Sequence, residues 1–200
     1  MKNRLGKDNS GFSLIELIVA VLIIAIISGG AIMAFNSIFS SQAEAAAKNV
    51  VNALKQTRAF ALGKENKDTT MTGDTTQVYA KFYYSGDTLN VDVCKDDASG
   101  TAVLHNQQIS GVPFKVKFYK VSGASETEAF TMGDTDVVKM YFKKSTGGVA
   151  SVARYSAAGS PIGSPVTGVN KLTVCRASNE DNKKSLVIVE LTGRCYVDND

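Results

Sequence analysis

A single carboxylate stands near the start of a long apolar run, and its chemistry needs an explanation. Glu16 lies in GFSLIELIVAVLIIAIISGG, residues 11–30, and no other charge occurs between Leu17 and Phe35. A carboxylate at the centre of a bilayer costs about 2.5–3.5 kcal/mol. Glu16 therefore either lies at headgroup level, where a carboxylate suits a helix N-terminus, or pairs with a positive charge.

The apolar run predicts a membrane-spanning helix over residues 12–35, because about 20 apolar residues cross a bilayer. Lys2, Arg4 and Lys7 precede it, and this basic end predicts a cytoplasmic N-terminus and an exported C-terminal part. The run is too long for a secretory signal peptide, and no small-residue cleavage site closes it. A plain signal anchor would give no reason for Glu16.

The stretch Gly11-Phe12-Ser13-Leu14-Ile15-Glu16 resembles the class III signal of type IV pilins and pseudopilins. That signal is a short basic leader ending in glycine, then an apolar residue, Ser or Thr, and a glutamate at the fifth position of the mature chain. The resemblance implies cleavage between Gly11 and Phe12 by the prepilin peptidase, followed by N-methylation of Phe12. The apolar helix would then be retained.

This resemblance also implies a role for Glu16. Cleavage leaves an α-amine on Phe12 that carries a positive charge near neutral pH. In a filament, Glu16 of one subunit would pair with the Phe12 ammonium of its neighbour. Glu16 would thereby set the docking register of an incoming subunit.

Residues 36–63 predict an amphipathic continuation of the same helix. The segment has no proline before Gly63, and its apolar residues recur at helical spacing: Ala47, Val50, Val51, Leu54, Ala61 and Leu62. Glu44 and Lys48 form an i, i+4 pair on the other side. Gly63 predicts the helix end. Because glycine weakens a helix, Gly29 and Gly30 are expected to be where it bends or unwinds in a filament.

Residues 64–200 alternate strand-like runs with turns, which predicts a β-rich globular head. The expected strands are Gln77–Tyr84, Leu89–Cys94, Lys115–Val121, Val137–Lys143, Val149–Tyr155, Lys171–Arg176 and Leu186–Val197. Residues 178–184 are expected to form a polar turn. The fold class is therefore α+β, with one long N-terminal helix packed on antiparallel sheet.

Three short stretches resemble GspH/FimT-like minor pseudopilins: ALKQTRAFALGKENK, KMYFKKSTGGV and LVIVELTGRCYV. They look like the helix end, a strand carrying F-x-x-x-G and a last strand ending in Gly-Arg. This resemblance implies a minor subunit whose head has two small β-sheets and no catalytic residues.

The three cysteines, Cys94, Cys175 and Cys195, leave several arrangements open. An exported domain favours one disulfide and a free thiol, although full reduction also fits. The pairing of Cys175 with Cys195 is favoured because the two C-terminal segments are adjacent in sequence. Cys94 and Cys175 fall on the polar sides of their strands.

No enzyme chemistry is indicated. The chain has one histidine, His105, expected on an exposed loop, and no nucleophile motif, phosphate-binding loop or zinc spacing. We expect no catalytic residues, no cofactor and no metal site. Two acidic groups could reach calcium but do not fit an EF-hand, and surface turns explain them better: Asp92, Asp96 and Asp97, and Asp134 with Asp136.

Four segments are therefore expected: a cleaved leader (1–11), a transmembrane and filament-core helix half (12–35), an amphipathic half (36–63) and the head (64–200). The expected partners are other pilin subunits, the prepilin peptidase and the inner-membrane assembly platform. The subunit would be single-pass in the cytoplasmic membrane and then part of an extracellular or periplasmic filament. The alternative is a competence pseudopilin whose head contacts DNA through Lys143, Lys144 and Arg154, or through Lys183 and Lys184.

Overall fold

The computed structural model describes residues 13–63, 77–97, 100–109, 112–177 and 179–198. Within them, the side chains of residues 30–36, 97, 100, 179, 181 and 182 are not described. The chain divides into two compact units at Ile38 and Phe39. The described elements are one helix, α1 (Leu14–Leu62), and ten strands. The strands are β1 (Gln77–Ser85), β2 (Thr88–Asp97), β3 (Gly100–Gln108), β4 (Phe114–Ser122), β5 (Ser125–Thr131), β6 (Val137–Phe142), β7 (Val149–Tyr155), β8 (Lys171–Arg176), β9 (Asn179–Ile188) and β10 (Cys195–Val197).

Helix α1 has defined ends. The carbonyl of Ser13 accepts hydrogen bonds from the amides of Glu16 (3.0 Å) and Leu17 (3.2 Å). The bond from Leu17 is the first i→i−4 bond of the helix, and the bond from Glu16 satisfies one of the N–H groups that the first turn otherwise leaves unpaired. At the other end the Gly63 amide donates to the Phe60 carbonyl at 3.2 Å. The predicted end of the helix at Gly63 is confirmed, and the helix is continuous through Gly29 and Gly30.

The part of α1 that belongs to the head buries one stripe of small and apolar residues. The predicted positions Ala47, Val50, Val51, Leu54 and Ala61 are buried, whereas Leu62 is 42% exposed. Further buried positions complete the stripe: Ala43, Ala46, Ala53 and Thr57. The recurrence at three and four residues is that of a helix with one face on a core. On the outer side, the predicted pair of Lys48 and Glu44 is formed at 2.7 Å.

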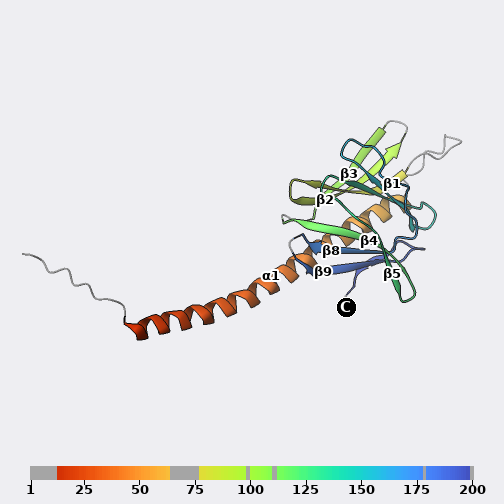
Figure 1. Ribbon diagram of the computed structural model, residues 1–200. Helices are drawn as coiled ribbons and strands as arrows, with labels where there is room; N and C mark the ends of the chain where they lie inside the picture. Colours follow the sequence, from red (N-terminus) through yellow and green to blue (C-terminus); the bar gives the residue numbers. More distant parts are fainter. Residues whose placement is uncertain (1–12, 64–76, 98–99, 110–111, 178, 199–200) are drawn as a thin grey trace, which may run out of the picture. The chain divides into compact units, whose positions relative to one another are not determined.

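Two antiparallel five-stranded sheets build the rest of the head (Figure 1). We call them sheet A, with the order β3-β2-β1-β6-β7, and sheet B, with the order β10-β9-β8-β4-β5. The predicted α+β class and the two sheets implied by the pilin resemblance are confirmed. Strands β3 and β5 were not predicted, and the expected polar turn at 178–184 is largely strand β9, in which Lys183 and Lys184 pair with Cys175 and Val174.

The main core joins α1 to both sheets. Phe82 of sheet A meets Phe118 of sheet B edge to face, with ring centroids 5.7 Å apart. Phe118 stacks in turn on Phe130 at 4.7 Å. Such aromatic pairs add about 0.5–1.5 kcal/mol each beyond the burial of their surface. The same cluster contains the buried stripe of α1, so one continuous core holds the three layers of the head together.

A second connection is made at one end of the head, where three segments meet closely. The Arg58 Nε of α1 donates to the Thr192 carbonyl in the β9–β10 loop. Gly147 and Gly193 have φ of 70° and 64°, and a Cβ on Gly193 would overlap the Gly147 carbonyl oxygen. A Cβ on Gly148 would overlap the Glu190 carbonyl oxygen. We call Arg58, Gly147, Gly148 and Gly193 the glycine junction. It unites the three stretches that resemble minor pseudopilins.

Candidate functional site

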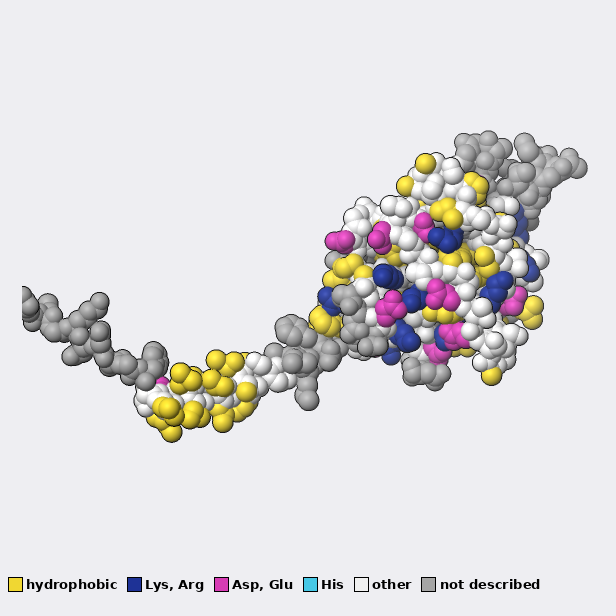
Figure 2. Space-filling model, in the orientation of Figure 1, with side chains coloured by type: hydrophobic (Ala, Val, Ile, Leu, Met, Phe, Trp, Pro, Cys, Tyr) yellow, Lys and Arg dark blue, Asp and Glu magenta, His cyan; other side chains and the backbone are white. Residues whose placement is uncertain are grey.

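The first four turns of α1 expose apolar side chains on all sides. From Leu14 to Ile27 the large apolar residues are 50–78% exposed: Leu14, Ile15, Leu17, Ile18, Val19, Val21, Leu22, Ile23, Ile24, Ile26 and Ile27. Figure 2 shows hydrophobic side chains gathered along the visible face of this helix segment. A helix that is hydrophobic all round is stable when it is buried in lipid or among other helices. This segment therefore has the surface of a helix that is stable when lipid or other helices surround it.

Among the described residues, no helix reaches the combination of length and apolar character that crossing a membrane requires. The expected span, residues 12–35, includes Phe12 and the side chains of residues 30–35, which lie outside the described part.

Glu16 occupies the first turn of α1 and is the acidic residue of that turn. Its amide donates to the Ser13 carbonyl, so the Glu16 carboxylate projects from the first turn of α1. A negative charge there interacts favourably with the helix dipole. Gly11 and Phe12, the expected cleavage pair, lie outside the described residues, so the roles of Gly11, Phe12 and Glu16 stay predictions.

The sequence comparisons bear on this segment. Residues 6–32 match the family model described as the prokaryotic N-terminal methylation motif. The chain thus carries the class III prepilin signal and, with its α+β head, is consistent with a type IV pilin-like protein. No curated protein and no solved structure matches the chain. The GspH/FimT subtype is not confirmed.

The flexible position predicted at Gly29 is open to test, because a Cβ there would meet nothing within 4 Å. We expect Gly29→Ala to strengthen the helix by about 1 kcal/mol. Amide exchange at residues 28–31 should slow about five-fold, since 1 kcal/mol changes an opening equilibrium by that factor. Hydrogen–deuterium exchange of the full chain in detergent measures this, and unchanged exchange would show that the helix is not weakened at Gly29.

The cysteines are all buried and free. Cys175 and Cys195 lie on β8 and β10, which flank β9, and strands two apart are about 9–10 Å from each other. A disulfide needs Cα atoms about 4.4–6.8 Å apart. The favoured Cys175–Cys195 bond is therefore not formed. Instead the Cys195 thiol donates to the Val51 carbonyl of α1 at 3.5 Å, and the Cys175 thiol to the Lys115 carbonyl at 3.8 Å.

Burial should make these thiols unreactive. Burial, with Asp92 nearby, raises the pKa of Cys94 from 9.0 to about 11. Burial likewise raises the pKa of Cys195 to about 11. A raised pKa keeps the thiol protonated until higher pH, so at pH 8 the thiolate fraction falls about 100-fold. We expect iodoacetamide to label the folded chain slowly at pH 8 and faster as pH approaches 11, read by mass spectrometry. Rapid labelling of the native chain at pH 8 would contradict this.

Two of the aspartates considered for calcium, Asp96 and Asp136, are engaged in local contacts. Asp136 accepts from the Gly133 amide at 2.9 Å and pairs with Arg154 at 2.8 Å. Asp96 accepts from the Tyr79 hydroxyl at 3.0 Å. Within the described residues no cluster of three His, Cys, Asp or Glu side chains is arranged to hold a metal ion. His105, expected on a loop, instead lies on strand β3.

Besides β5 and most of β9, the sequence did not predict strand β3 or the contacts of the glycine junction. The three stretches that meet in the junction each resemble a part of minor pseudopilins, but nothing in their spacing along the chain indicates that they touch. In β3 the run GTAVLHNQQ lacks regular apolar alternation, since most of its side chains are exposed at a sheet edge. A β-bulge also interrupts its register with β2 between Val93 and Cys94.

Proposed function

We propose that the protein is a structural subunit, a minor pilin or pseudopilin of a type IV pilus or a type II secretion-like filament. The observation that carries the proposal is the methylation motif at residues 6–32, which includes the exposed apolar start of α1. Processing at this motif would remove only the leader and would leave the apolar helix at the start of the mature chain. The head contributes no catalysis in this proposal.

The proposed sequence of events begins in the cytoplasmic membrane. The prepilin peptidase cuts between Gly11 and Phe12, Phe12 is methylated, and residues 12–35 hold the chain in the bilayer with the head exported. The assembly platform then moves the subunit into a filament, where other pilin helices surround the apolar segment. Glu16 pairs there with the Phe12 ammonium of a neighbouring subunit.

The N-terminus of the membrane-extracted protein tests this proposal. We expect intact-mass and N-terminal analysis to find a chain that starts at methylated Phe12 when the prepilin peptidase is present. Without the peptidase the chain should still start at Met1. A chain that keeps Met1 in both strains, or that is cut after residue 30, would overturn the proposal in favour of a signal anchor or an ordinary secretory signal.

The second candidate, a competence pseudopilin that contacts DNA, needs a free basic surface. Arg154 is held by the Asp136 carboxylate and also lies over the Phe130 ring at 5.1 Å, so it is poorly available to phosphate. Lys183 is exposed on β9 and is the better candidate. Salt-dependent binding of duplex DNA that is lost in Lys183→Glu would favour this role. Binding that survives the change would exclude this surface.

A further inference from the structure

The two sheets of the head have four edges, and three of them are protected against pairing with another chain. The loop at residues 160–166 covers β7, with the Val152 amide donating to the Val166 carbonyl at 2.8 Å and the reverse bond at 2.7 Å. Strand β10 has only three residues. Strand β5 carries Glu126 and Glu128. Coverage, shortness and charge are the usual means by which an edge avoids association.

Among the described residues, nothing covers the fourth edge, β3, which is neither short nor charged. It spans nine residues, Gly100–Gln108, whose sequence GTAVLHNQQ contains no proline, Asp, Glu, Lys or Arg. Most of its side chains are exposed, and Val103 is 56% exposed. Among the described residues, no strand pairs with the side of β3 that faces away from β2. A long, uncharged, open edge is a template for a further strand.

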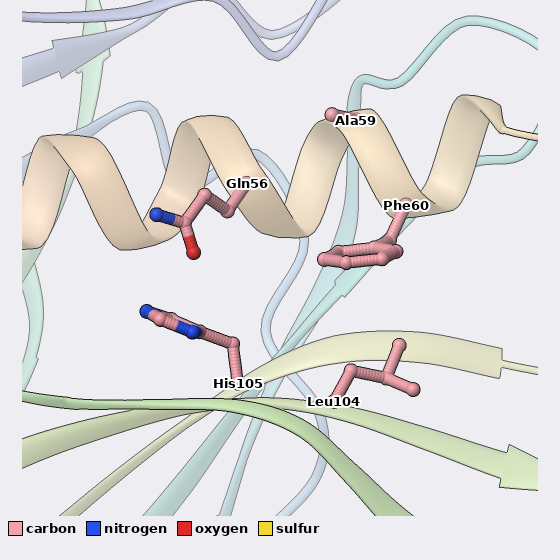
Figure 3. A pocket seen from close by; sticks show the side chains of 5 residues that line it. All are labelled: Gln56, Ala59, Phe60, Leu104 and His105. Atoms are coloured by element: carbon pink, nitrogen blue, oxygen red, sulfur yellow. The ribbon is translucent and has the colours of Figure 1, made fainter.

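The bulge also gives this edge an apolar flank. Val103 pairs with Cys94 and His105 with Val93, so Leu104 is the extra residue of β3. Leu104 and His105 consequently both face α1, where they line a cleft of ≈ 430 Å³ with Gln56, Ala59 and Phe60. In Figure 3, Phe60 and Leu104 approach one another across this cleft, and Gln56 extends toward His105. Bulges that re-aim side chains are common beside binding sites.

We propose that β3 pairs antiparallel with β3 of a second copy of this chain, around a two-fold axis at Val103. Backbone N–H and C=O groups along an open edge are satisfied by an extended strand, which defines the kind of occupant. In this register Val103 lies against its counterpart, and Ala102 lies against Leu104 of the second copy. A large side chain thus meets a small one, and the exposed Val103 pair is covered.

The charge pattern favours a second copy as the source of that strand. Self-pairing is isologous, so every charge on the edge would face a like charge near the axis. Like charges directly opposite each other in a sheet are destabilising. Strand β3 has no such charge, whereas β5 would set Glu126 and Glu128 near their own counterparts. Two-fold pairing through β3 yields a dimer and no larger assembly. The proposal uses only residues of the head, so it does not depend on the filament role proposed above.

Cysteine cross-linking of the full-length chain in native membranes tests the pairing. Cβ atoms of directly opposed residues lie about 4.5–5.5 Å apart, so Val103→Cys should form an intermolecular disulfide on mild oxidation. The native cysteines are buried, which keeps them out of the reaction. The matched control is Thr127→Cys, an exposed position on the β5 edge. We expect a product of twice the chain mass from the first variant and at least five-fold less from the second.

Three results would overturn the proposal: no cross-link from Val103→Cys, equal cross-linking from Thr127→Cys, or a product whose mass shows a different protein. A charge-swap experiment decides independently. In detergent extracts of a strain that lacks the prepilin peptidase, where no filament forms, two differently tagged full-length copies should lose co-capture when both carry Val103→Glu or both carry Val103→Lys, and regain it when the two variants are mixed. The same pair of changes at Val189, an exposed valine outside β3, should have no effect. Absence of recovery in the mixture would reject a two-fold contact at Val103. The N-terminus of the protein is measured in a separate experiment. Failure of the β3 pairing can therefore be distinguished from failure of the proposed pilin function.

Discussion

Gly193→Ala is expected to destabilise the head by about 3 kcal/mol or more, combining an overpacking cost with backbone strain. Gly193 has φ of 64°, and an added Cβ would overlap the Gly147 carbonyl oxygen, which belongs to a backbone that is itself in a tight turn. The neighbouring Arg58 side chain holds the same loop and leaves little freedom to move. Urea unfolding of the full chain in detergent, followed by tyrosine fluorescence, measures the loss.

The matched control separates the overlap from the backbone conformation. Gly123 has a similar φ of 59°, but an added Cβ there meets nothing within 4 Å. Gly123→Ala should therefore cost only about 1–2 kcal/mol, the penalty of a left-handed conformation. Equal losses from both variants would show that the glycine junction can relax, and that its close packing contributes nothing specific.

Glu16→Gln is expected to block assembly while leaving processing intact. Under the proposed function, removing one partner of a pair in an apolar setting costs roughly 3–5 kcal/mol. Since 1.4 kcal/mol is a factor of ten, incorporation into filaments should fall at least about 100-fold. The variant should still be cut before Phe12 and accumulate in the membrane, as measured by quantitative blotting of membrane and sheared-filament fractions.

Glu44→Gln provides the corresponding control on the same helix. Glu44 pairs with Lys48 on an exposed surface, where such a contact contributes little. Assembly of this variant should match that of the unchanged chain. Glu16→Gln chains that enter filaments normally would show that the carboxylate is not the docking group, even if N-terminal processing proceeds as proposed.

Much of the fold could be predicted because its signals are local. The stripe of α1, its end at Gly63 and the strands with alternating apolar residues, such as β4 with FKVKFYKVS, depend on periodicity within a few residues. The prepilin signal is likewise a contiguous motif. These features need no knowledge of what packs against them.

The features that were missed depend on tertiary contacts. Strands β3 and β5 are sheet edges with much exposed surface, so their sequences carry little apolar alternation. Strand β9 contains polar residues because its pairing with β8 is made by backbone groups, which any side chain permits. At the glycine junction, the hydrogen bond from Arg58 to Thr192 joins residues 134 positions apart, and such a contact leaves no trace in local spacing.

The contact between Arg58 and Thr192 also has a consequence for how the head reaches its native state. Cys195, near the end of the chain, bonds to Val51 of the helix, a separation of 144 residues. Contacts of such high sequence separation close long loops and slow folding. The buried stripe of α1 therefore stays partly uncovered until β10 has been synthesised and Cys195 has reached the helix. A chain that stalls before β10 is made would present that stripe to chaperones and proteases, so the docking of β10 onto β9 marks the completion of the head.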